Sequence, residues 1–167
     1  MNKQAYTGED KLAQEVGQLL LQKQYTVACA ESCTGGLVSS RLTDISGSSQ
    51  YVMGGVVAYT NEVKISHLGV APETLAAYGA VSPETAGEMS AGIRRAIHTD
   101  LGIGITGIAG PGGGSAKKPV GLVYLSLTTP TGTITQGCNF QGTRTEIKWQ
   151  SSEKALTMLK EYLQTVI

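Results

Sequence analysis

The order of helical and extended segments predicts an α/β fold with a mixed central sheet covered by helices. Amphipathic helical patterns first alternate with short apolar runs, which is typical of strands joined by helices. Later, two β-rich segments flank a Pro-Thr-Gly turn at 130–132, which predicts a hairpin. At 167 residues the chain is most simply one domain covering 1–167, large enough to bury a core.

The first part of the chain contains the elements that carry most polar candidates. Apolar residues recur at helical spacing near the N-terminus, and a short apolar run follows them. We expect a helix at 9–24, a strand at 25–30, a helix at 34–43, a loop at 45–50, a β-rich segment at 51–60 and a short helix capped by Asn61.

Proline marks the next two helix starts, because its fixed φ suits the first turn. Pro72 opens one helix and Pro83 opens a longer one that reaches about His98. The remaining elements are expected to be a strand at 101–106, a glycine-rich loop, strands at 119–128 and 133–140, and a helix at 143–166.

Composition argues against several classes of function. The formal net charge is zero and the chain has one Trp and one Phe, so neither a basic nucleic-acid surface nor a base-stacking platform is predicted. No apolar run approaches the ~18 residues that span a bilayer, and the N-terminus lacks the apolar core of a signal peptide. Three cysteines form neither a disulfide framework nor a paired zinc motif. We therefore expect a cytoplasmic protein without membrane or nucleic-acid partners.

Ser32 lies where an apolar strand turns into a helix opened by Gly35 and Gly36. A hydroxyl there is close to unpaired backbone N–H groups and to the positive end of the helix dipole, which stabilise an oxyanion or a phosphate. An ordinary helix cap by Ser32 or Thr34 explains the same pattern, so both interpretations stay open.

Tyr59 and Lys64 form a second candidate group after the next strand. Lys64 lies three residues after Asn61, so a helix places both on one face. A lysine acts as a general base only when its pKa is lowered, and a solvated surface lysine is the ordinary alternative. Serine, lysine and tyrosine without an evident histidine partner indicate a serine–lysine type of hydrolase.

Three further features offer binding groups. The segment 106–114, which starts at Thr106 and Gly107, lacks the lysine and the following helix of an ATP-binding loop, but its backbone could hold one phosphate or carboxylate. Arg144 opens the last helix, where a guanidinium suits a phosphate. Ser49 offers another hydroxyl. A connecting loop, a surface arginine and a turn are the respective alternatives.

Together these segments resemble the CinA C-terminal domain family in its stand-alone form. The similarity runs from about residue 14 to 163 and rests on motifs in the family's order. They are AESCTGG (30–36), GSS (47–49), VAYTNEVK (57–64), GAVS (79–82), TGIAGP (106–111), KPVG (118–121) and GTR (142–144). Thr143 and Lys148 depart from the aspartate and arginine that family members often carry. Larger CinA proteins also have an N-terminal molybdopterin-binding-like domain, and the activities of that domain are not expected of this chain.

The resemblance implies a three-layer α/β/α fold, a homo-oligomer (dimer or trimer) and a nicotinamide mononucleotide (NMN) deamidase of the pyridine nucleotide cycle. Such an amidohydrolase forms nicotinic acid mononucleotide and ammonia without a metal or another cofactor. Lys64 would be the base and Tyr59 would position or relay the proton. Ser32 or Ser49 would attack the amide, with the other serine assisting. The substrate would be held by Thr34, Gly35, Gly36, Thr106, Gly107 and Arg144.

Two other functions remain open from the sequence. A non-catalytic nucleotide-binding paralogue would keep the pocket without turnover, although binding alone needs no base. A serine hydrolase for another amide or ester would keep the catalytic groups and change the substrate.

Overall fold

The computed structural model describes residues 10–166. Within this range helices and strands alternate before a C-terminal hairpin and a long last helix. The elements are α1 (Lys11–Lys23), β1 (Val27–Glu31), α2 (Leu37–Thr43), the 3₁₀ turn η1 (Ser48–Gln50), β2 (Val52–Val57), α3 (Asn61–Leu68), α4 (Pro72–Tyr78), α5 (Pro83–Ile97), β3 (Leu101–Gly107), β4 (Leu122–Thr129), β5 (Gly132–Asn139) and α6 (Arg144–Thr165).

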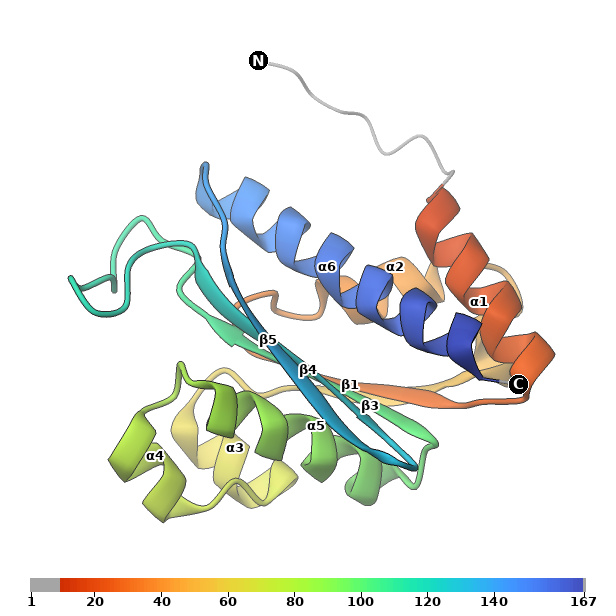
Figure 1. Cartoon of the computed structure of the whole chain (residues 1–167), viewed down its shortest axis with the longest axis horizontal. Coiled ribbons are helices and arrows are strands. Elements are labelled where there is room, and N and C mark those ends of the chain that lie inside the picture. Colours follow the sequence, from red (N-terminus) through yellow and green to blue (C-terminus); the bar gives the residue numbers. More distant parts are fainter. Residues whose placement is uncertain (1–9, 167) are drawn as a thin grey trace.

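The strands form one mixed sheet in the order β2-β1-β3-β4-β5, and helices cover both faces (Figure 1). α1, α2 and α6 lie on one face, whereas α3, α4 and α5 lie on the other. β1 pairs in parallel with β2 and β3, and the β3–β4 and β4–β5 pairs are antiparallel. The predicted α/β class, mixed sheet and three layers are confirmed.

The parallel part of the sheet determines where a ligand can enter. Because β1, β2 and β3 run in the same direction, their carboxyl ends meet at one edge. The segments that follow them, 32–36, 58–60 and 108–121, therefore gather at that edge. Open α/β sheets bind ligands in the crevice at this position.

Two buried layers hold the helices on the sheet. The larger layer lies under α1, α2 and α6 and includes Leu20, Leu42 and Leu159. The smaller layer lies on the opposite face and includes Met89 and Ile93 of α5. β1 is buried along its whole length, which explains why its first four residues, 27–30, are apolar.

Several predicted boundaries shift. α2 begins at Leu37, not at residue 34, because Gly35 (φ 63°) and Gly36 (φ 98°) adopt left-handed conformations that prolong the turn. Thr60, not Asn61, caps α3, since the Thr60 hydroxyl accepts a hydrogen bond from the Val63 amide.

Other differences are smaller. The predicted loop at 45–50 contains η1, and the first strand of the hairpin starts at Leu122 after a longer loop. α1 is capped by the Asp10 side chain, while the predicted helix start at Glu9 lies outside the described residues.

Candidate active site

A cavity of about 220 Å³ opens at the carboxyl ends of β1, β2 and β3. It draws residues from the turn after β1, the segment from β2 into α3, the segment before α5, the end of β3 with the loop that follows it, and the start of α6. Its lining residues are Ser32, Cys33, Tyr59, Asn61, Lys64, Ala80, Val81, Thr106, Gly107, Ala109 and Arg144. Six of the ten predicted site residues, Lys64 among them, therefore line this cavity.

Ser32 and Lys64 make direct contact inside the cavity. Lys64 Nζ lies 3.2 Å from Ser32 Oγ and 2.8 Å from the carbonyl oxygen of Ala58. The Lys64 side chain is almost completely buried, with 1% of its surface exposed, and Ser32 is also buried. α3 thus places the amine beside the serine turn, 32 residues earlier in the chain.

Burial lowers the pKa of Lys64, because desolvation disfavours the ammonium form. Within residues 10–166 Lys64 forms no ion pair with a carboxylate that would restore the charge. A neutral amine can donate to the Ala58 carbonyl and accept the Ser32 hydroxyl proton with its lone pair. This geometry suits a general base that activates a nucleophile.

The turn that carries Ser32 is held by the carboxylate of Glu31. Its oxygens accept hydrogen bonds from the amides of Gly36, Val38 and Ser39 at the start of α2. The Gly35 amide donates to the Ser32 carbonyl. Protein groups therefore occupy the amides that were expected to hold a phosphate, and neither Gly35 nor Gly36 lines the cavity. The positions of Gly35 and Gly36 therefore give no support to substrate binding by these residues, which stays a prediction.

Ser49 lies at the opposite end of the sheet from Ser32. It belongs to η1, which precedes β2, whereas Ser32 follows β1, and these strands are parallel with Val27 opposite Val52. A five-residue strand spans about 17 Å, so Ser49 cannot contact Lys64 of the same chain. The predicted role of Ser49 as a nucleophile within one chain is not supported by its position.

Thr34 is also outside the cavity. It is 1% exposed, and its hydroxyl has no hydrogen-bond partner among the described residues. Its expected contact with substrate is not supported by this buried position.

Tyr59 and Arg144 lie together at the rim. Arg144 Nη2 donates to the Tyr59 hydroxyl at 2.8 Å, and Nη1 donates to the Gly110 carbonyl at 2.8 Å. Arg144 thereby connects the end of β2, the glycine-rich loop and the start of α6. Tyr59 is 58% exposed, so both side chains are accessible to a ligand that enters the cavity.

Thr106 and Gly107 form part of the cavity wall. The Thr106 hydroxyl donates to the Ala80 carbonyl at 2.7 Å, which ties β3 to the segment before α5. Gly107 has no space for a side chain, because a Cβ there would lie 2.7 Å from the Leu122 carbonyl oxygen. These residues shape the wall, and the Thr106 hydroxyl is already bonded.

Asn61 and Cys33 also line the cavity, although neither was among the predicted site residues. Asn61 could have been selected, because its spacing from Lys64 puts both on one helix face. Burial raises the pKa of the Cys33 thiol to about 12, so the thiol stays protonated at neutral pH and is a poor nucleophile.

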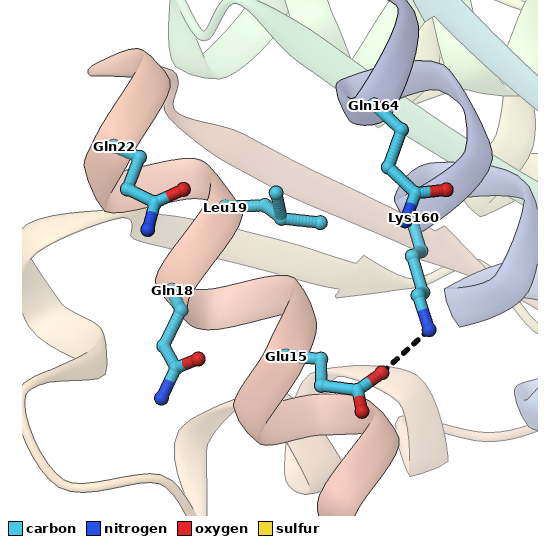
Figure 2. Close-up of a pocket in the computed structure, with 6 residues that line it drawn as sticks. All are labelled: Glu15, Gln18, Leu19, Gln22, Lys160 and Gln164. Carbon is cyan, nitrogen blue, oxygen red and sulfur yellow. Dashed lines mark hydrogen bonds and ion pairs between the residues drawn. The ribbon is translucent and has the colours of Figure 1, made fainter.

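A second hollow, between α1 and α6, is far less suited to chemistry (Figure 2). It is lined by three glutamines, Leu19 and the ion pair of Glu15 with Lys160 (2.5 Å). None of the predicted site residues lies there. Among residues 10–166, no group of three or more His, Cys, Asp or Glu side chains is arranged to bind a metal ion.

The model of the CinA C-terminal domain matches residues 9–163. The chain belongs to the CinA C-terminal domain family. A protein named for competence-damage induction from Moorella thermoacetica is 54% identical over 92% of this chain and 37% of its own length. A similarly named protein from Halothermothrix orenii is 51% identical over 94% of this chain and 39% of its own. The chain thus spans about two fifths of these relatives.

Solved structures share the CinA fold. The competence/damage inducible protein CihA from Agrobacterium tumefaciens has a TM-score of 0.89 and 42% identity, covering 92% of this chain and 94% of its own. A CinA superfamily protein from Klebsiella pneumoniae has a TM-score of 0.90 and 33% identity, covering 93% and 97%. Among the described residues of this CinA domain, no helix is long and apolar enough to cross a membrane.

Proposed function

We propose that this chain is an amidohydrolase that converts NMN and water to nicotinic acid mononucleotide and ammonia. The observation that carries the proposal is the contact between Ser32 and the buried amine of Lys64 inside an open cavity. Among residues 10–166 this amine has no carboxylate partner. Burying an amine costs free energy. A protein that only binds its ligand gains nothing from a buried base beside a hydroxyl that would offset this cost. The substrate is proposed from the family resemblance of the site motifs.

In the proposed first half-reaction, neutral Lys64 takes the proton of Ser32 Oγ while Oγ attacks the carboxamide carbon. The tetrahedral adduct then collapses as the Lys64 ammonium returns the proton to the departing nitrogen, so ammonia leaves and an ester on Ser32 remains. In the second half, Lys64 takes a proton from water, and the resulting hydroxide attacks the ester. As the second tetrahedral adduct collapses, the Lys64 ammonium returns the proton to Ser32 Oγ, which restores the hydroxyl and the neutral amine. The carboxylic acid that leaves loses its proton to solvent and becomes the carboxylate.

The Ala58 carbonyl orients the base during both steps. It accepts a hydrogen bond from Lys64 Nζ, with 2.8 Å between nitrogen and oxygen. With one N–H fixed in this way, the lone pair of the neutral amine can face Ser32. Preorganisation of this kind lowers the barrier because the reacting groups need not be ordered in the transition state.

Arg144 and Tyr59 are the proposed contacts for the nucleotide part of the substrate. A guanidinium binds phosphate oxygens through parallel hydrogen bonds, and a tyrosine hydroxyl donates to phosphate or ribose oxygens. Their rim position leaves the reacting carboxamide to the deeper Ser32 and Lys64.

The proposal is tested by ammonia release from NMN, with nicotinamide and nicotinamide riboside measured alongside. We expect turnover of NMN and little or none of the two compounds that lack phosphate. Phosphate-dependent binding of NMN without ammonia would instead identify a binding protein. Turnover of another amide, but not of NMN, would identify a serine hydrolase of different specificity.

A further inference from the structure

The Glu31 carboxylate is buried directly beside Ser32, with 1% of the residue exposed. It accepts hydrogen bonds from the amides of Gly36 (3.1 Å), Val38 (3.1 Å) and Ser39 (2.9 Å). The Ser39 hydroxyl adds a fourth bond at 2.8 Å. Four donors and the positive end of α2 together compensate the buried negative charge.

This arrangement differs from an ordinary helix cap. The N-cap residue Gly36 has no side chain to bond the first helical turn, and the missing acceptor comes from the end of the preceding strand. The carboxylate therefore joins the last residue of β1 to the first turn of α2. It closes the intervening turn, 32–35, whose first residue is the proposed nucleophile.

The backbone of Glu31 leads to the proposed base. Its carbonyl accepts a hydrogen bond from the Ala58 amide at 2.8 Å, and the Ala58 carbonyl in turn accepts one from Lys64 Nζ at 2.8 Å. Ser32 is fixed from the other side, because its amide donates to the Ile105 carbonyl at 2.9 Å. Glu31 thus connects the turn that carries Ser32 to Ala58, whose carbonyl holds the Lys64 amine.

We propose that Glu31 is a positioning residue that holds the Ser32 hydroxyl against Lys64 for the reaction proposed above, on which this inference rests. The carboxylate does not touch the cavity, since Glu31 is absent from its lining. It acts by fixing the turn, so its loss displaces Ser32 and slows attack more than it weakens substrate binding. Misplacement of a reacting group by about 1 Å can cost about 100-fold in rate.

The first test is Glu31→Gln, which keeps the length of the side chain but places an NH₂ group against amide donors. We expect kcat for NMN to fall about 10–100-fold with KM within about twofold, because the lost interaction matters for attack and not for binding. Glu31→Asp retains an all-acceptor carboxylate and should recover part of the loss. Ser39→Ala removes one bond of four and should give a smaller decrease, which keeps the idea testable where Glu31→Gln does not fold.

Asp100→Asn is the matched control at the opposite end of β1. The Asp100 carboxylate accepts hydrogen bonds from the amide and hydroxyl of Thr26, both at 2.8 Å, and so anchors the same strand away from the site. We expect this variant to lower the unfolding temperature while leaving kcat close to that of the wild type.

A readout that needs no NMN is the labelling rate of Ser32 by a fluorophosphonate, with the site located by peptide mass spectrometry. Slower labelling in Glu31→Gln, with normal labelling in Asp100→Asn, is the expected result. Unchanged labelling and kcat in folded Glu31→Gln, or equal losses in both variants, would overturn the positioning role and leave the proposed function intact. A wild-type protein that neither takes the label nor releases ammonia would overturn the proposed function, and this inference with it.

Discussion

Lys64 is the residue whose surroundings determine the chemistry of the site. An exposed lysine is protonated at neutral pH and cannot accept a proton. Lys64 is buried against Ser32 and the Ala58 carbonyl, without a carboxylate partner among the described residues, and its pKa is lowered for that reason. The neutral form needed for catalysis is therefore accessible at lower pH than for a solvated lysine.

This lowered pKa predicts the pH dependence of turnover. The active form of Lys64 is deprotonated, so kcat/KM for NMN should rise with pH and level off below pH ~10.4, the pKa of a free lysine. Lys64→Arg should lose about 1,000-fold or more, because a guanidinium stays protonated. A kcat/KM profile measured from pH 6 to 10 checks the prediction; a rate that falls steadily as pH rises would contradict it.

The sequence was informative for residues that follow strands. Strand ends and helix starts supplied the candidates, and the family resemblance gave them roles. The structure brings six of them to one cavity, namely Ser32, Tyr59, Lys64, Thr106, Gly107 and Arg144. For Gly36 the sequence did not reveal that the Glu31 carboxylate already accepts a hydrogen bond from its amide at the helix start. That contact depends on a rotamer and on burial, which a residue pattern does not specify.

At the scale of elements, α5 packs closely on β3 because glycine removes side chains from the contact. A Cβ at Gly104 would lie 2.4 Å from the Ala86 carbonyl oxygen and 2.6 Å from the Ser90 amide. A Cβ at Gly92 of α5 would lie 1.9 Å from the Leu68 carbonyl oxygen, where α3 ends. These contacts set the position of α3, and with it that of Lys64.

Gly104→Ala should therefore destabilise the fold by about 1–3 kcal/mol, because an added methyl group must displace α5 backbone. Gly112→Ala is the control, since a Cβ there meets nothing within 4 Å. Denaturant unfolding of both variants measures the difference. Equal stability of the two would show that α5 shifts on β3 without cost.

Helix starts were predictable where a local signal exists. Pro72 and Pro83 open α4 and α5 at the predicted residues, and Thr143 caps α6 through a reciprocal contact with Glu146. The start of α2 was placed too early, because glycine is compatible with helix, turn and loop. The left-handed φ values of Gly35 and Gly36 depend on how the whole turn 32–36 closes, which no single residue indicates.

At the scale of the molecule, alternation of elements was enough to predict a mixed sheet, but not its order. The order β2-β1-β3-β4-β5 depends on which helices cross which face, and only tertiary packing determines that. It is this order that places the ends of β2 and β3 on either side of Ser32. The distance of Ser49 from the site follows from the same topology.

The sequence-based predictions of a catalytic Ser49 and of a homo-oligomer hold together only if another copy of the chain supplies the serine. For a dimer, these predictions mean that Lys64→Ala and Ser49→Ala are each inactive alone. When the two variants are mixed and reassembled in equal amounts, half of the dimers contain one copy of each and have one complete site of two. The mixture should then regain about a quarter of wild-type ammonia release. Native mass spectrometry verifies the mixing. Mixed dimers without activity would rule out a shared site.

The most direct test of the Ser32–Lys64 mechanism is ammonia release from NMN by Ser32→Ala, compared with Ser66→Ala as a control. Ser66 is an exposed hydroxyl on α3, the helix that carries Lys64, and it bonds only within that helix among the described residues. We expect Ser32→Ala to fold normally and lose turnover by several orders of magnitude, and Ser66→Ala to retain it. Near wild-type turnover in folded Ser32→Ala would contradict the mechanism.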